Sequence, residues 1–296
     1  MSQTILVFGR SGQVARELDK LGVHAGFQLE FAGREDLDLG AGVDPRPLIE
    51  ARAPTAVINA AAYTAVDKAE SDADAAFRLN RDAPAAIARA CADLGLPLVH
   101  FSTDYVFDGT KAEPYVEDDP IRPLGVYGRS KAEGEAAVLE SDAWAGVLRT
   151  AWVYSAHSSN FLKTMLRLGQ TRDEIGVVDD QFGRPTWARD CAVGALRLVQ
   201  ALLDRDTRAA GVLHLTGAGD ATWADFAEAI FAESASRGGP HARVKRISTA
   251  DYPTLARRPA NSRLDCAKIA GALDLHPRHW RDSLATCFDE LGVEGS

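Results

Sequence analysis

The start of the chain places a short apolar run, a glycine-rich turn and a helical pattern in immediate succession. Residues 4–8 are apolar enough for a buried parallel strand, Gly9 follows at once, and residues 13–21 have the pattern of a helix. A dinucleotide-binding turn requires this context, because its glycines let the backbone approach a pyrophosphate beside the helix N-terminus. Gly9 and Gly12 are therefore candidate cofactor-binding residues. A glycine-rich turn in an α/β protein that binds no nucleotide is the alternative.

The second predicted strand ends at the position where such proteins select their cofactor. Residues 27–32 are strand-like and stop at Gly33 and Arg34. An acid at this position commonly binds the ribose hydroxyls of NAD, whereas an arginine accommodates the 2′-phosphate of NADP. Arg34 therefore predicts a preference for NADPH, and NADH stays open because Glu35 and Asp36 follow directly. A solvated loop cation is the alternative interpretation of Arg34.

Two further predicted strands end in residues that suit a binding crevice. Residues 56–59 lead into a run of small residues, against which a flat cofactor could lie. Residues 97–102 form another buried strand, and Thr103 and Asp104 follow it. Ligands of open α/β sheets bind at the carboxyl ends of the strands, so we expect Thr103 in the same crevice as the glycine turn. Its hydroxyl could hydrogen-bond a substrate carbonyl and polarise it.

Tyr127 and Lys131 stand four residues apart in a segment with a helical pattern. On a helix this spacing puts both side chains on one face, so the ammonium can lie beside the phenol. A cation there favours the phenolate and is expected to lower the pKa of Tyr127 towards neutrality. Tyr127 is therefore a candidate proton donor to a carbonyl that receives a hydride. An ordinary exposed helix face is the alternative.

Strand and helix patterns alternate over residues 1–151, and the chain then changes character. The alternation predicts an α/β fold, a Rossmann-type doubly wound parallel sheet that binds a dinucleotide. Residues 152–296 are expected to form mainly a smaller, discontinuous C-terminal substrate-binding lobe, while a segment at about 187–217 returns to the sheet. Trp152 directly follows a predicted strand, so it is a candidate substrate contact, with a place in the core as the alternative.

Composition excludes some classes of function. The net charge of −9 argues against a nucleic-acid groove. The run of residues 4–8 is too short for a signal peptide core, and no apolar run approaches membrane length, so we expect a cytoplasmic protein without membrane contact. The four cysteines lack the C-x-x-C spacing and are expected to be reduced thiols.

Several segments together resemble one family along nearly the whole chain and in the right order. The chain resembles the extended short-chain dehydrogenases/reductases, and within them the family of dTDP-4-dehydrorhamnose reductases. The resemblance rests on residues 9–14, 59–70, 102–109, 126–131, 149–154, 160–165, 180–186 and 258–264.

The resemblance implies a role for each matched position. Tyr127 would be the proton donor, Lys131 would hold the nicotinamide ribose, and Thr103 would stand where many relatives carry Ser. Gly12, Gln13 and Val14 would contact the pyrophosphate, Asp38 and Leu39 the adenine end, and Ala62, Tyr63 and Thr64 the nicotinamide side. The sugar nucleotide would be bound by Thr103, Asp104, Trp152, and by Arg258 and Asn261 from a late basic loop.

The resemblance also implies a reaction. A hydride from NADPH or NADH would reduce the C4 ketone of dTDP-4-dehydro-L-rhamnose to dTDP-L-rhamnose. Two alternatives stay open: another NAD-dependent sugar-nucleotide epimerase or dehydratase, and a non-catalytic nucleotide-sensing subunit like the regulatory subunit of methionine adenosyltransferase. The intact set of Thr103, Tyr127 and Lys131 favours an enzyme.

Some relatives form dimers through an acidic surface that Mg²⁺ bridges. Glu17 matches one ligand of that surface, but Arg189 stands where a second acid is expected. We therefore predict no metal site, although Mg²⁺ is not excluded, and a homodimer stays open.

Overall fold

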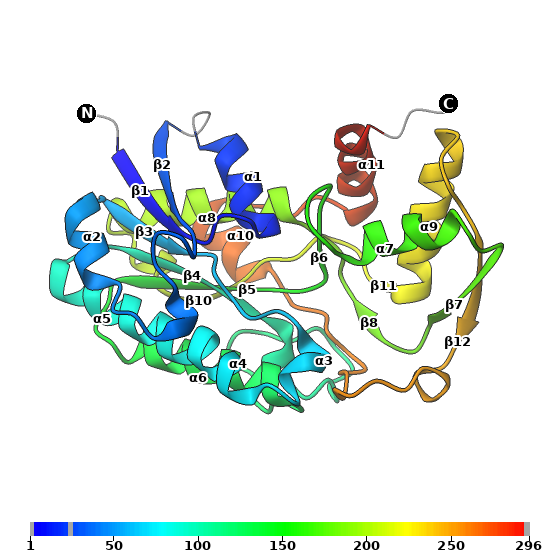
Figure 1. The fold of residues 1–296 in the computed structure, drawn as a ribbon, viewed down its shortest axis with the longest axis horizontal. Coiled ribbons are helices and arrows are strands. Elements are labelled where there is room, and N and C mark those ends of the chain that lie inside the picture. Colours follow the sequence, from blue (N-terminus) through cyan, green and yellow to red (C-terminus); the bar gives the residue numbers. More distant parts are fainter. Residues whose placement is uncertain (1–2, 23–25, 293–296) are drawn as a thin grey trace.

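A six-stranded parallel sheet forms the centre of the larger part of the molecule (Figure 1). The structure, a computed structural model, describes residues 3–22 and 26–292. The strand order is β10-β5-β4-β3-β1-β2, and every neighbouring pair is parallel. Because β1 lies between β2 and β3, the order reverses beside β1, and a crevice at the carboxyl ends of these strands is expected there. The strands are β1 (Gln3–Phe8), β2 (Phe27–Ala32), β3 (Ala56–Asn59), β4 (Leu98–Thr103), β5 (Ala145–Thr150) and β10 (Gly211–His214).

Helices cover both faces of this sheet. Alternate side chains of β1 point to opposite sides: Ile5 and Val7 lie in one apolar core, and Leu6 and Phe8 lie in the other. One face packs against α1 (Gln13–Leu21), α8 (Ala188–Leu203) and α10 (Ala267–Leu273). The other packs against α2 (Arg46–Arg52), α5 (Ala83–Leu94) and α6 (Val126–Leu139). The predicted α/β class, with a Rossmann-type doubly wound parallel sheet, is therefore confirmed.

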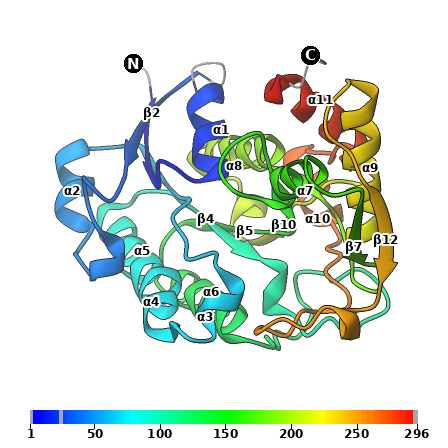
Figure 2. The same ribbon diagram turned by 45° about the vertical axis from the view of Figure 1, so that its right-hand side comes forward.

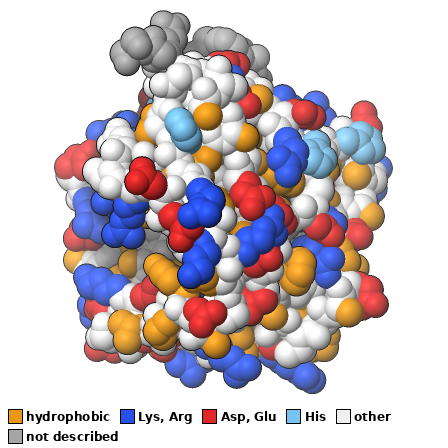
Figure 3. All heavy atoms as spheres, turned by 90° about the vertical axis from the view of Figure 1, so that its right-hand side faces the viewer, with side chains coloured by type: hydrophobic (Ala, Val, Ile, Leu, Met, Phe, Trp, Pro, Cys, Tyr) orange, Lys and Arg blue, Asp and Glu red, His pale blue; other side chains and the backbone are white. Residues whose placement is uncertain are grey.

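A smaller lobe lies beside the sheet and has its own apolar core (Figures 1 and 2). Its largest buried side chains include Trp187, Phe226 and Trp280. Figure 3 shows basic and acidic side chains interspersed over its outer face. The lobe contains β6 (Val153–Tyr154), α7 (Phe161–Gly169), β7 (Glu174–Val178), β8 (Phe182–Gly183), β9 (Thr186–Trp187), β11 (Ala221–Thr222), α9 (Trp223–Ser236), β12 (Arg243–Ile247) and α11 (Trp280–Leu291).

The chain crosses between sheet and lobe more than once. After β9, helix α8 and strand β10 lie against or within the six-stranded sheet, and the chain then enters α9 of the lobe. The division into residues 1–151 and 152–296 stays a prediction. Within the described ranges 3–22 and 26–292, no helix is both long and apolar enough to cross a membrane.

One predicted helix is interrupted. An alanine-rich pattern over residues 74–94 predicts a single helix, whereas the structure has α4 (Ala73–Phe77), a π-helical segment (Arg78–Asp82) and α5. Pro84 supplies the physical reason, because it has no N–H for the carbonyl of Asn80 and its ring clashes with that carbonyl in a regular helix. The short helix α3 (Val66–Ala69) precedes this region.

Candidate active site

The glycine turn opens a crevice at the carboxyl ends of β1, β2 and β3. Gly9 has a φ of 105°, and a Cβ atom there would lie 3.1 Å from the carbonyl carbon of Ala60, so a side chain would be strained in conformation and space. The crevice has a volume of about 480 Å³. Its lining includes the following predicted cofactor residues: Gly9, Gly12, Arg34, Asp38, Leu39 and Ala62.

Gln13, predicted to contact the pyrophosphate, makes its side-chain bonds to the lobe instead. Its Nε2 donates to the Val153 carbonyl at 3.3 Å, and its Oε1 accepts from Ser155 Oγ and Asn160 Nδ2, both at 2.9 Å. Gln13 therefore ties the start of α1 to the loop after β6. Val14 packs against the core between α1 and the sheet, so the predicted cofactor role of both residues stays a prediction.

A second arginine, which was not among the predicted cofactor residues, lies beside the end of β2. Arg10, inside the glycine turn, donates to Glu35 Oε1 at 2.7 Å and to the Phe31 carbonyl at 2.8 Å. Arg34 is exposed and forms no hydrogen bond or ion pair with any residue in the described part of the chain. Arg10, Arg34 and Glu35 all line the crevice. The sequence contained one signal for this role of Arg10, namely that a basic residue stands between the two glycines of the turn.

The π-helical segment holds the nicotinamide-side loop against α6. Asn80 Oδ1 accepts from the Tyr63 backbone N–H at 2.8 Å, and Asn80 Nδ2 donates to the Tyr63 carbonyl and to Ser130 Oγ, both at 3.0 Å. The Tyr63 hydroxyl donates to Asp72 at 3.1 Å. The segment containing Ala62, Tyr63 and Thr64 is therefore fixed relative to the helix that carries Tyr127. Thr64 itself is exposed.

Thr103, Tyr127 and Lys131 come together at the carboxyl end of β4. Thr103 is the last residue of β4, and its hydroxyl donates to Asp104 Oδ1 at 3.0 Å and lies close enough to the Tyr127 phenol to affect its pKa. Lys131 lies one turn after Tyr127 on α6, and its Nζ donates to the Phe101 carbonyl at 2.5 Å. Helix α6 starts where the carboxylate of Glu70 accepts the Val126 N–H at 2.8 Å. The structure thus brings the three predicted catalytic residues together.

Burial governs the ionisation of these groups. It raises the pKa of Tyr127 to about 12, and the nearby Thr103 hydroxyl only partly opposes the rise. The prediction that Lys131 lowers the pKa of Tyr127 is therefore wrong for the protein described here, because desolvation is the dominant effect. Burial also lowers the pKa of Lys131 to about 8, against the opposing charge of Glu135. Tyr127 is consequently a neutral phenol at neutral pH, which is the form that a proton donor requires.

Asp104 and a late loop lie next to Thr103. Burial raises the pKa of Asp104 to about 6, and the hydroxyls of Ser262 and Thr103 oppose that rise. In the same loop, Arg258 forms an ion pair with Asp67 at 2.8 Å. The structure therefore places the loop around residues 258–262 against the end of β4. Asp67 and Ser262 could not be identified from the sequence, because their partners Arg258 and Asp104 are distant in the sequence.

Asn261 and Trp152 are both engaged by the protein itself. Asn261 is buried, and its Nδ2 donates to the carbonyls of Lys111 and Glu113 at 2.8 and 2.9 Å. Trp152, with a φ of 50°, stacks on Trp223 with ring centroids 3.6 Å apart. Asn261 thus shapes its loop, and Trp152 belongs to an aromatic group in the lobe. Their contacts with a substrate stay predictions.

Comparisons with known proteins match the chain to one family over nearly its whole length. The chain matches the RmlD substrate binding domain family over residues 3–293. It is 43% identical to the dTDP-4-dehydrorhamnose reductase of Sinorhizobium fredii, with 98% of each chain covered. It is 40% identical to that of Escherichia coli K12, with 97% of each chain covered.

Solved structures of similar fold include members of the same family. The dTDP-4-dehydrorhamnose reductase of Bacillus anthracis, in complex with NADP, is similar with a TM-score of 0.91 and 31% identity, over 98% of this chain and 100% of that one. A UDP-glucose 4-epimerase of Brucella ovis has a TM-score of 0.79 and covers 98% of both chains, but its 17% identity shows the shared fold alone. The chain therefore belongs to the RmlD substrate binding domain family, together with the dTDP-4-dehydrorhamnose reductases that it resembles, as the sequence analysis predicted.

Proposed function

We propose that this chain is an NADPH-dependent oxidoreductase that reduces the C4 ketone of dTDP-4-dehydro-L-rhamnose, with Tyr127 as the proton donor. One observation supports the proposal above all: Thr103, Tyr127 and Lys131 lie together beside the crevice at the glycine turn. The relatives of the chain are named as reductases of this substrate. Family membership favours this reaction over an epimerase, a dehydratase or a regulatory subunit.

The protein's own residues would complete the reduction as follows. Bound NADPH supplies the hydride that C4 receives, and the electron pair of the C=O bond moves to the oxygen. Tyr127 gives its phenolic proton to that oxygen, while the Thr103 hydroxyl, on the same hydrogen-bond network, holds the carbonyl in place. An alkoxide is more basic than a phenolate, so this transfer is downhill even with the raised pKa of Tyr127. Lys131, when charged, stabilises the phenolate that remains.

Cofactor selection is proposed to lie at the end of β2. Arg34 would bind the 2′-phosphate of NADPH, and Arg10 stands in the same crevice as a second guanidinium. Guanidinium groups suit phosphate because their donors form a planar fork. Glu35, which pairs with Arg10, would instead accept the ribose hydroxyls of NADH. This arrangement supports NADPH as the main cofactor and NADH as a second one.

The substrate is proposed to enter between the end of β4 and the lobe. The Arg258 guanidinium is partly buried and forms an ion pair with Asp67. It lies close enough to Tyr105 for its charge to oppose the rise that burial causes in the pKa of this phenol. A diphosphate could replace the Asp67 carboxylate as the partner of this guanidinium. Thr103, Asp104, Trp152 and Asn261 are proposed to complete the sugar-nucleotide site.

One assay separates the proposed reaction from the alternatives. The purified chain is mixed with NADPH and dTDP-4-dehydro-L-rhamnose, the nicotinamide absorbance is followed, and the product is identified. We expect stoichiometric oxidation of NADPH and formation of dTDP-L-rhamnose. An epimerase or dehydratase would carry tightly bound NAD⁺ and oxidise no added NADPH, and a sensing subunit would bind nucleotide without turnover. Size-exclusion chromatography of the same sample would test the homodimer.

A further inference from the structure

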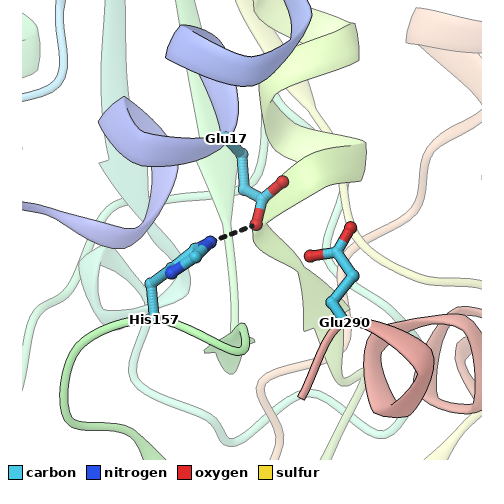
Figure 4. Close-up of side chains that lie close together, drawn as sticks. All are labelled: Glu17, His157 and Glu290. Carbon is cyan, nitrogen blue, oxygen red and sulfur yellow. Dashed lines mark ion pairs between the residues drawn. The ribbon is translucent and has the colours of Figure 1, made fainter. Parts of the chain in front are cut away.

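Three side chains outside the active site converge where the sheet meets the lobe. Glu17 comes from α1, His157 from the loop after β6, and Glu290 from α11 (Figure 4). One ligand-type atom of each lies within 4.8 Å of the others. Glu17 is completely buried, and its Oε1 lies 3.4 Å from His157 Nε2. Neither of these two atoms has a hydrogen-bond partner within residues 3–22 and 26–292.

By its donor atoms alone this cluster could hold a divalent cation. Two carboxylates and one imidazole are ligands for several first-row divalent ions, among them Mn²⁺. An unpaired carboxylate is costly to bury, so the completely buried Glu17, with the partly buried Glu290 close to it, is stabilised by a cation between them. The identity of that cation decides what the cluster does.

The protein supplies the cation itself. Arg189, at the N-terminal end of α8, pairs with Glu17 through Nε at 3.0 Å and also forms an ion pair with Glu290. Lys20 pairs with Glu290 at 3.1 Å. The two negative charges are thus balanced by two positive ones, and an added divalent ion would enter a site without net negative charge.

We propose that Arg189 acts as a built-in cation that fastens α11 of the lobe to α1 and α8 of the sheet, in the position that a metal ion would otherwise occupy. A Mg²⁺ ion, as some relatives use, does not fit these residues, because it would have to displace the guanidinium from both carboxylates. The corollary is specific: removal of the guanidinium alone turns Glu17, His157 and Glu290 into a site for a divalent cation.

Thermal unfolding in EDTA and in MnCl₂ tests the proposal, together with binding of Mn²⁺ followed by electron paramagnetic resonance. The wild-type chain should have the same Tm in both solutions and bind no Mn²⁺. Arg189→Ala should lower the Tm in EDTA by roughly 5–15 °C, since the buried Glu17 carboxylate then keeps only the more distant Lys20 ammonium, at 3.8 Å, as a cationic partner. MnCl₂ should then restore much of the loss, with one Mn²⁺ bound per chain.

Two variants sharpen the result. Arg189→Ala combined with Glu290→Gln should lose the rescue, because one ligand is gone. Arg16→Ala removes an exposed arginine next to Glu17 that forms no ion pair in the described part of the chain, so it should change neither Tm nor Mn²⁺ binding.

Three outcomes would overturn the proposal. One is a wild-type Tm that rises with Mn²⁺ or Mg²⁺, and another is an Arg189→Ala chain as stable as wild type. The third is a destabilised Arg189→Ala chain that binds no Mn²⁺. If Arg189→Ala does not fold, Arg189→Gln keeps a hydrogen-bond donor without the charge and is subject to the same expectations.

Discussion

Replacement of Tyr127 by Phe removes one hydroxyl from the centre of the proposed site and leaves the ring in place. The ring packs edge-on against Tyr105, with centroids 5.4 Å apart and an interplanar angle of 77°, and a Phe ring can keep this contact. The loss is the polar contact of the hydroxyl with Thr103, which contributes no more than one hydrogen bond, about 0.5–1.5 kcal/mol of stability. For a chain of this size we expect a decrease in Tm of only a few degrees.

The effect on turnover should be far larger. Loss of a general acid lowers kcat by roughly 10²–10⁴-fold, which is about 3–5 kcal/mol of transition-state stabilisation. NADPH affinity, measured by fluorescence titration, should hardly change, because Lys131 is still present. Tyr154→Phe is the matched control: Tyr154 is fully buried in the lobe and its hydroxyl donates to the Trp280 carbonyl at 3.3 Å, so turnover should be normal. A near-normal kcat for Tyr127→Phe would refute the assignment.

Four further predictions follow from charges at the site. NADPH affinity should fall as the pH rises above about 8, where Lys131 loses its proton, and Lys131→Met should remove this dependence in titrations from pH 6 to 9.5. Arg34→Ala should raise the KM for NADPH by about one to two decades and spare NADH; equal effects on both cofactors would show a solvated cation. Arg258→Ala should weaken dTDP binding in isothermal titration and leave NADPH binding intact, whereas unchanged dTDP affinity would exclude Arg258 from the nucleotide site. Burial raises the pKa of Asp104 in the folded state to about 6. The folded state therefore binds this proton more tightly than the unfolded chain does, which stabilises the fold at low pH, and the stabilisation is lost as the pH rises through about 6. Wild type should therefore lose about 2 kcal/mol of unfolding free energy relative to Asp104→Asn between pH 4 and pH 7 in urea unfolding, and a constant difference would contradict the raised pKa.

Local sequence patterns predicted the elements of the sheet half closely. Helix α1 and strands β2 and β3 have the predicted bounds, and glycine marks the ends of β1 and β2. Strand β3 is a fully buried run of the kind expected in the middle of a parallel sheet. Asn160, a residue type that favours helix N-caps, directly precedes α7, and its Oδ1 accepts the Lys163 N–H at 3.1 Å. Such features depend on neighbours a few residues away, so the sequence shows them directly.

Features that depend on distant partners could not be predicted in this way. The Arg10 guanidinium is held at the cofactor crevice by a hydrogen bond to the Phe31 carbonyl, which lies 21 residues further along the chain. The ion pair of Arg258 with Asp67 spans 191 residues. The direction of the Tyr127 pKa shift was predicted wrongly for the same reason, since the spacing to Lys131 is local but burial is set by the whole fold.

Three sets of contacts along helix α6 fix the position of Tyr127 and Lys131. Glu70 accepts a hydrogen bond from the first N–H of the helix, and Asn80 holds its second turn through Ser130. One turn beyond Lys131, Glu135 forms a fully buried ion pair with Arg149 of β5, at 2.7 Å. Loss of one partner of such a pair commonly costs about 3–5 kcal/mol, so α6 cannot easily shift relative to the sheet. Tyr127 and Lys131 are therefore held at the end of β4 by contacts that lie outside the reacting centre, and the orientation of the proton donor follows from this anchoring.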